Sequence, residues 1–147
     1  VEGGVEIKFP GGFRLTSDIN FQVGEEELQD GTVSPSRHAA PLFGVTRLTY
    51  QNGPLTLMCF LQYQGRRDFE DLAVEERGKT EIYAKDVDGN HYAHAWYTLN
   101  IKAMYSFGRW FSVSAGLENI TDQRYRPYSS GVSGAGRNFV LSGTVMF

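Results

Sequence analysis

The strongest constraint on this chain is a strict alternation of apolar and polar residues over long stretches. From Phe13 to Val23 the odd-numbered positions are mostly apolar and the even-numbered positions are polar, and the pattern recurs from Tyr97 to Ser106. A period of two places successive side chains on opposite faces of a strand, whereas a helix requires a period of 3.6. The sequence therefore predicts a chain built from long β-strands.

Seven segments fit this pattern. Aromatic residues make up 14% of the chain, and they favour strands. Most of the segments have the length that a tilted strand needs to cross a bilayer, about 9–11 residues. The predicted strands are Gly4–Phe9, Phe13–Val23, Phe43–Tyr50, Leu55–Gln64, Trp96–Phe107, Trp110–Glu118 and Asn138–Phe147.

The connections between these strands alternate between short and long. Pro10-Gly11-Gly12, Asn52-Gly53 and Gly108 are tight-turn signals. Between them lie polar segments at about 24–42, 67–95 and 119–137. Short turns at one end and long loops at the other are typical of an outer-membrane β-barrel, whose long loops lie outside the membrane.

Aromatic residues gather near both ends of the predicted strands, which is the arrangement of the two interfacial girdles of a membrane barrel. The group beside the short turns is Phe9, Phe13, Tyr50, Tyr105, Phe107, Trp110 and Phe111. The group beside the long loops is Phe21, Phe43, Tyr63, Trp96, Tyr97 and Phe139.

The alternation alone leaves two soluble folds open, a β-sandwich and a lipid-binding barrel with an apolar interior. The orientation of Leu57, Leu99, Val113 and Leu141 distinguishes them from a membrane barrel, which turns these side chains outward. Seven is an odd number, and bacterial single-chain barrels have an even number of strands. We therefore expect partner strands upstream of Val1, which is not a Met.

Motifs for chemistry are weak. Gly131 to Ala135 lacks the second glycine of a nucleophile elbow. His91 and His94 have no third metal ligand placed by the sequence, and Asp86 to Asn90 lacks the closing Glu of a calcium loop. With a net charge of −3 and scattered Lys and Arg, the chain shows no basic stripe for nucleic acid and no cofactor motif.

The last thirty residues resemble the C-terminal end of TonB-dependent outer-membrane receptors. The matching segments are GLENITDQRY at 116–125, YSSGV at 128–132 and GRNF at 136–139, followed by an aromatic terminal residue, Phe147. Upstream, GVEI at 4–7 resembles a recurrent strand opening of the same family. The residues that carry the motif are Glu118, Asn119, Asp122, Tyr125, Gly131, Gly136, Arg137, Asn138, Phe139 and Phe147.

The resemblance implies an all-β fold: an antiparallel up-and-down meander of about seven strands, the C-terminal portion of a 22-stranded transmembrane β-barrel. Residues 1–147 would be one segment of the barrel domain, with the plug domain and the earlier strands absent. It also implies a non-enzymatic receptor that binds a ferric siderophore, cobalamin, haem or oligosaccharide and imports it with energy from TonB. The implied partners are the TonB complex through the plug region, outer-membrane lipid, the barrel-assembly machinery through the strand ending at Phe147, and the solute.

Most motif residues are expected to shape the last loop rather than to bind a ligand. Alternation turns Glu118 toward the lumen, where Arg137 is expected to pair with it. Asn119 and Asp122 suit a turn, and the glycines at 131, 134 and 136 suit positive backbone angles. Two other functions remain open: an acyl hydrolase on a small closed membrane barrel, and a soluble lipid-binding barrel.

Overall fold

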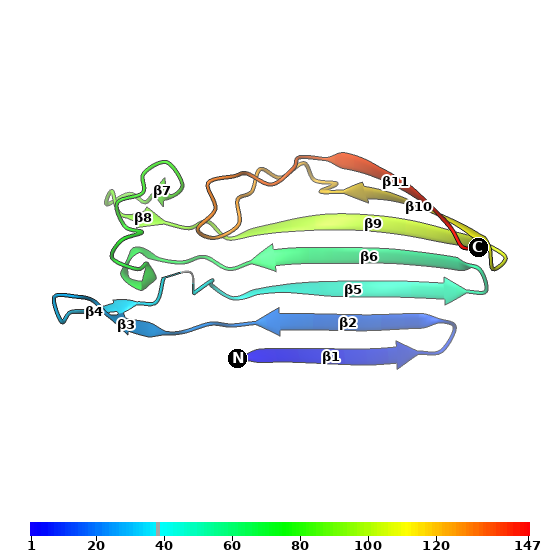
Figure 1. Ribbon diagram of the computed structural model, residues 1–147, viewed down its shortest axis with the longest axis horizontal. Coiled ribbons are helices and arrows are strands. Elements are labelled where there is room, and N and C mark those ends of the chain that lie inside the picture. Colours follow the sequence, from blue (N-terminus) through cyan, green and yellow to red (C-terminus); the bar gives the residue numbers. More distant parts are fainter. Residues whose placement is uncertain (38) are drawn as a thin grey trace.

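Seven long strands form one open antiparallel sheet in chain order (Figure 1). The computed structural model describes residues 1–37 and 39–147. The sheet order β1-β2-β5-β6-β9-β10-β11 confirms the predicted up-and-down meander. The long strands are β1 (Glu2–Phe9), β2 (Phe13–Asn20), β5 (Phe43–Asn52), β6 (Leu55–Gln64), β9 (Trp96–Phe107), β10 (Phe111–Glu118) and β11 (Asn138–Val145).

The predicted strand boundaries agree closely with the observed ones. β6 and β9 have the predicted bounds, and the others differ by one to three residues at an end. The largest difference is in β2, which ends at Asn20 rather than Val23. Backbone pairing nevertheless reaches one residue further, because the Phe21 N–H donates to the Val1 carbonyl at 2.8 Å.

The short turns depend on glycine where the backbone doubles back. Gly12 has a φ of 86°, in the left-handed region that L side chains avoid. A Cβ atom added to Gly12 would lie 2.2 Å from the Gln51 carbonyl oxygen, so the turn also needs the space. The Gln51 N–H donates to the Gly12 carbonyl at 2.9 Å and thereby ties this turn to the next strand pair.

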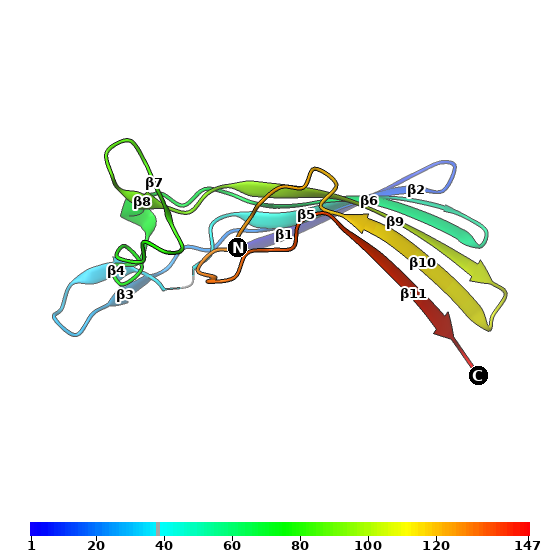
Figure 2. The same ribbon diagram turned by 90° about the horizontal axis from the view of Figure 1, so that it is seen from above.

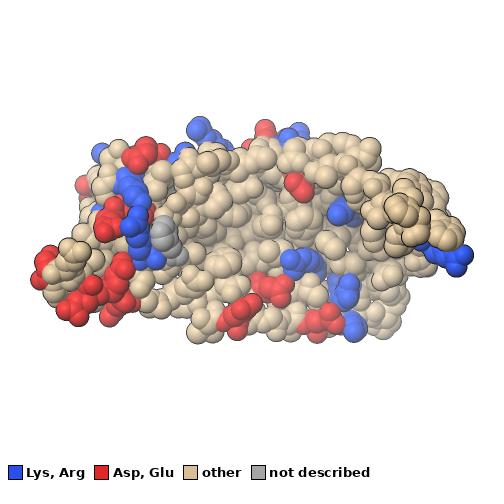
Figure 3. Space-filling model, in the orientation of Figure 1, with Lys and Arg blue, Asp and Glu red and all other residues tan. Residues whose placement is uncertain are grey.

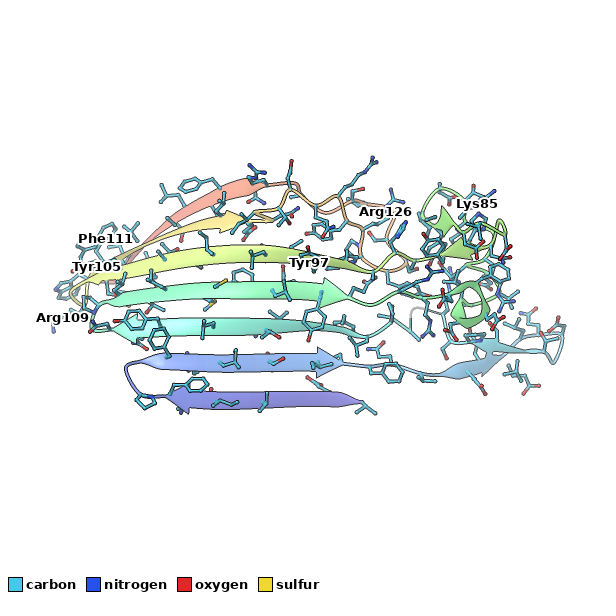
Figure 4. All side chains as sticks on the ribbon, turned by 180° about the vertical axis from the view of Figure 1, so that it is seen from behind. Lys85, Tyr97, Tyr105, Arg109, Phe111 and Arg126 are labelled. Atoms are coloured by element: carbon cyan, nitrogen blue, oxygen red, sulfur yellow. The ribbon has the colours of Figure 1, made fainter. Side chains whose placement is uncertain are left out.

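One face of the sheet is apolar and bare. The register aligns Leu57, Ala103, Ala115 and Leu141 across four neighbouring strands. The side chains of this face cover the strands in Figure 4, and Leu57 is 42% and Leu141 65% exposed. Leu99 and Val113 lie on the same face by alternation. A contiguous apolar surface of this extent is an interaction surface, for lipid or for protein.

The opposite face is polar, and charged side chains gather on it over β1, β2 and β5 (Figure 3). Glu6 pairs with Lys8 at 3.1 Å and with Arg14 at 3.9 Å. Asp18 pairs with Arg47 at 2.8 Å across β2 and β5. The two faces thus differ in polarity as the alternation predicts.

The strand residues of the aromatic row beside the short turns lie on the apolar face, whereas Trp110 lies in the turn before β10. Phe13 packs on Tyr50 with ring centroids 4.7 Å apart, and Phe107 packs on Phe111 at 5.7 Å. Figure 4 shows Tyr105 and Phe111 together at this end and Tyr97 toward the other.

The aromatic row beside the long loops was predicted partly wrongly. Phe21, Tyr63, Tyr97 and Phe139 follow the apolar face, but Phe43 and Trp96 do not. Both are paired with Gln64 in the register and therefore lie on the polar face. The prediction grouped these aromatic residues by their distance from the loops. That distance does not show whether a residue is at an odd or an even strand position, which decides the face on which its side chain lies.

All three long loops lie at the same end of the sheet, opposite the short turns (Figure 1). The sequence predicted no secondary structure within these polar segments, but the described residues of the loops form two small hairpins and a 3₁₀ turn. These elements are β3 (Glu25–Glu27), β4 (Val33–Pro35), η1 (Phe69–Asp71), β7 (Ala84–Lys85) and β8 (His91–Tyr92). Figure 2 shows the two loops that carry β3/β4 and β7/β8 extending past one end of the sheet, while β10 and β11 bend out of the plane of the central strands.

The small hydrophobic core lies in the loops and not on the sheet. Leu72, Tyr83 and Ala93 form it, with Ile82 and Tyr128 packed against them. Within residues 1–37 and 39–147, no helix is long and apolar enough to cross a membrane.

Candidate functional site

Asn119 organises the last long loop, which folds back over the polar face. It is 1% exposed and has a φ of 48°, in agreement with the expected turn. Its side-chain Nδ2 donates to the carbonyls of Gln123 and Ala135 at 2.8 and 3.0 Å, and its Oδ1 accepts from the Gln123 N–H at 2.9 Å. Its own N–H donates to Asn100 Oδ1 at 2.9 Å, which fixes the loop to β9.

Asp122 closes the same loop from its other side. It has a φ of 53°, and its Oδ1 accepts the Arg137 N–H at 2.7 Å. Tyr125 lies further along the loop, with its ring 4.5 Å from the ring of Trp96 on the polar face. Asp122 and Tyr125 therefore hold the loop to its own exit and to the sheet.

Two expectations about this loop were wrong. Gly131, Gly134 and Gly136 do not have positive φ angles. Two of them are instead sites of close approach, since a Cβ atom on Gly134 would lie 2.1 Å from the Tyr125 ring and one on Gly136 would lie 2.8 Å from Asp122 Oδ1. Gly131 has open space around it.

The expected ion pair between Glu118 and Arg137 is also not formed within the part of the chain that the structure describes. The register places Asn138, and not Arg137, opposite Glu118. The neighbouring residue Phe139 pairs with Leu117 on the apolar face and is 68% exposed, and Phe147 lies exposed beyond β11.

The three long loops meet at the carboxylate of Glu76, whose side chain is fully buried. Lys79 Nζ donates to Glu76 Oε1 at 2.5 Å, and the hydroxyl of Tyr83 donates to Oε2 at 2.7 Å. Ser129 of the last loop donates to Oε2 at 3.3 Å. From the first loop, Arg37 Nε lies 3.9 Å from Oε1.

These contacts favour the ionised form of Glu76. Burial raises the pKa of this carboxyl, but the hydrogen bonds from Lys79 and Tyr83 and the charge of Lys79 outweigh burial and hold the pKa below its ordinary value. The pKa of Tyr83 is raised, first by burial and then by its hydrogen bond to Glu76, so Tyr83 stays a donor at neutral pH.

A cavity of about 370 Å³ opens beside this carboxylate, between the second and third long loops. Its lining includes two guanidinium groups, Arg124 and Arg126, and no carboxylate. Buried polar atoms of lining residues that have no hydrogen-bond partner among the residues described include Trp96 Nε1 and Gln123 Oε1. The full lining of this loop pocket is Ile82, Tyr83, Ala84, Ala93, His94, Ala95, Trp96, Gln123, Arg124, Tyr125, Arg126, Pro127, Tyr128, Ser129, Ser130 and Ser133.

The histidines and the acidic turn singled out in the sequence serve local contacts. His91 Nδ1 lies 2.6 Å from the Arg77 carbonyl, and His94 Nε2 lies 3.2 Å from the Tyr92 hydroxyl. Asp86 Oδ1 accepts the N–H groups of Asp88 and Asn90 at 2.9 and 2.8 Å, as in a polar turn.

Sequence reasoning missed Glu76 and its partners. Its segment was interpreted as a charged, solvated loop, and Arg37 and Ser129 are distant from it in the chain. Only the fold brings them together, and no spacing in the sequence marks them. The motif residues Asn119, Asp122 and Tyr125 were found because they lie close together in one loop.

Comparison with solved structures identifies the fold. The chain aligns with the copper transporter OprC at a TM-score of 0.76 and 16% identity, covering 99% of this chain and 23% of that one. It aligns with the ferric enterobactin receptor PfeA from Pseudomonas aeruginosa at a TM-score of 0.70, 14% identity, and 99% and 22% coverage. For the ferric citrate transporter FecA these values are 0.60, 14%, 91% and 21%.

The sheet has the fold of the C-terminal portion of a TonB-dependent receptor β-barrel, which confirms the predicted fold class. The chain spans less than a quarter of the length of these structures, with 23% the largest share among the three. No protein-family model matches the sequence, and no curated protein matches it.

Proposed function

We propose that this chain is the C-terminal segment of the barrel domain of a TonB-dependent transport receptor in the outer membrane of a Gram-negative bacterium. The observation that carries the proposal is the bare apolar face. Val5, Leu57, Ile101 and Leu141 are each more than 40% exposed on it. Aromatic rows border this face at both ends, as at the two interfaces of a bilayer. Lipid covers such a face, whereas a soluble lipid-binding barrel would turn it inward.

The rest of the barrel would lie upstream and would pair with the two outer strands. β1 and β11 each have a single neighbour in the sheet described here. Unpaired N–H and C=O groups on such edges cost several kcal/mol each in lipid, so a membrane sheet must close. The polar face would then line the lumen around a plug, and the strand leading to Phe147 would be the part read by the barrel-assembly machinery.

The solute would bind at the long-loop end, and the loop pocket is the candidate contact. No carboxylate in the lining faces its two guanidinium groups, and some of its lining residues, such as Trp96 and Gln123, have buried polar atoms without hydrogen-bond partners among the residues described. Such atoms cost about 1–3 kcal/mol each unless a partner pairs with them. A ferric siderophore, cobalamin, haem or an oligosaccharide would supply hydrogen-bonding groups at this place. OprC and FecA are transporters and PfeA is a receptor, which favours a transporter over a hydrolase.

Uptake by cells carrying the full-length protein tests this proposal. Ferric citrate, ferric enterobactin, cobalamin, haem and copper are supplied separately, with and without a functional TonB. We expect one of them to be imported only when TonB is present, and less efficiently by an Arg124→Gln variant. Val87→Gln is a matched control, because Val87 is an exposed loop residue outside the pocket. TonB-independent uptake, or none with an extended solute panel, would overturn the proposal.

A further inference from the structure

One buried carboxylate joins all three long loops. Glu76 has no exposed side-chain surface, and it is not among the residues that line the loop pocket. Tyr83 and Ser129, which bind its Oε2, come from the second and third loops and both line the loop pocket. Glu76 therefore lies behind the pocket and holds one residue from each of the two loops that form it.

The first loop reaches the same place by two routes. Arg37 lies between Glu76 and Glu75, at 3.9 Å from the former and 2.8 Å from the latter. Ser34, itself 1% exposed, accepts the Val74 N–H on its hydroxyl oxygen at 3.1 Å. The three loops are thus joined through one short segment of the second loop.

The contacts of Glu76 with the three loops, called the junction below, involve an ionised carboxylate. Hydrogen bonds to an ionised group are shorter and stronger than neutral ones, and a buried charge left without partners is costly. Glu76 Oε1 receives the ammonium of Lys79, while Oε2 receives two hydroxyls, so both oxygens are occupied. Removing the charge would weaken every one of these contacts at once.

We propose that Glu76 is a positioning residue that ties the three long loops into one unit and sets the distance between two walls of the loop pocket. The consequence for solute binding rests on the proposed function, but the mechanical role does not. A loop moved by solute would move its neighbours through this residue. Glu76 would transmit this movement without contacting the solute itself.

Hydrogen–deuterium exchange on the full-length protein tests the junction without any ligand. In a Glu76→Gln variant we expect the segments 34–37, 73–83 and 125–130 to exchange roughly 10- to 100-fold faster together, because each segment loses an ion pair with, or a hydrogen bond to, the charged carboxylate. The β9 strand should keep its wild-type exchange, which shows that the sheet is folded. Faster exchange confined to 73–83, or none, would overturn the proposal.

Glu75→Gln is the matched control. It removes the same charge from the adjacent residue, but that side chain is 58% exposed and contacts only the first loop through Arg37. We expect little change in 125–130. A milder variant, Tyr83→Phe, removes the 2.7 Å hydrogen bond and leaves Lys79 in place, so it should loosen the same segments by a smaller factor.

The pH dependence of hydrogen–deuterium exchange distinguishes a role of the Glu76 charge from simple packing of its side chain. Lys79, Tyr83, Arg37 and Ser129 face Glu76. The pKa of Glu76 lies below the ordinary value of 4.5, so the junction is intact above that value and is lost as pH falls through the lower pKa. The protection factors of the three segments, which correct for the pH dependence of intrinsic amide exchange, should fall in the wild type toward those of Glu76→Gln in acid, while those of the variant stay unchanged. A parallel acid response in both proteins would overturn the assignment.

Solute binding gives the final readout. The probes are ferric citrate, ferric enterobactin, cobalamin, haem and copper, each measured on full-length protein. For whichever binds, Glu76→Gln should weaken binding, whereas Glu75→Gln should not. If none of these solutes binds, and no oligosaccharide or other solute of an extended panel does, the proposed function fails while the exchange result still decides the role of Glu76. If Arg124→Gln weakens solute binding and Glu76→Gln leaves it unchanged, the proposed positioning role of Glu76 is wrong, while the proposed function still holds.

Discussion

Replacing Ile101 by Arg tests whether the apolar face contacts lipid. Ile101 lies in the centre of β9 and is 46% exposed on that face, four residues from each of the aromatics Tyr97 and Tyr105. Met104 is the matched control, because it is on the same strand and 39% exposed, but it lies on the polar face. Both changes replace an apolar side chain with the longer, charged side chain of Arg.

The expected magnitude follows from depth in the bilayer. At about 3.3 Å per residue, Ile101 is about 13 Å along the strand from each aromatic. A strand tilted by about 40° reduces this to about 10 Å along the membrane normal, close to the centre of an apolar band about 25 Å tall. An Arg on the lipid face at this depth costs about 2–4 kcal/mol. On the polar face, which would line the lumen, Lys102 already carries a charge at nearly the depth of Ile101. Met104 lies on the same polar face, so Met104→Arg should cost less than about 1 kcal/mol.

Equilibrium unfolding of the full-length protein in lipid bilayers measures this difference directly. Each variant is titrated with denaturant, and its free energy of unfolding is compared with that of the wild type. We expect Ile101→Arg to be the more destabilised by at least about 1 kcal/mol. Equal losses for the two variants, or a larger loss for Met104→Arg, would refute the assignment of the lipid-facing surface.

Three further outcomes are expected in the full-length protein. Asn119→Ala should destabilise the last loop by about 2–4 kcal/mol, because it removes three hydrogen bonds of a buried side chain, and unfolding or loop exchange would measure this. Gly134→Ala should displace Tyr125 from Trp96, since the new Cβ would lie 2.1 Å from the Tyr125 ring; unaltered Trp96 fluorescence would count against this packing. Protease added to intact cells should cut within 67–95, and cutting only after the outer membrane is ruptured would reverse the orientation.

Local periodicity was sufficient to determine the sheet. Alternation and turn residues such as Asn52-Gly53 predicted all seven long strands and their order, because hairpin pairing is set by neighbouring residues and short connections. The same pattern separated the two faces, so that Leu57 and Leu141 were correctly grouped. It did not assign Phe43 and Trp96, whose place depends on strand parity and not on nearness to a loop.

The loops depended on the tertiary structure. Asn119 and Asp122 were predictable as turn residues because their partners lie within the same loop. The role of Gly134 was not, since it arises from the approach of the Tyr125 ring rather than from a backbone angle. Glu76 has local partners in Lys79 and Tyr83, but Arg37 and Ser129 reach it only after the sheet has brought three long loops to one end. Strand pairing is encoded by residues close together in the chain, whereas a junction between loops exists only once the strands that carry them are aligned.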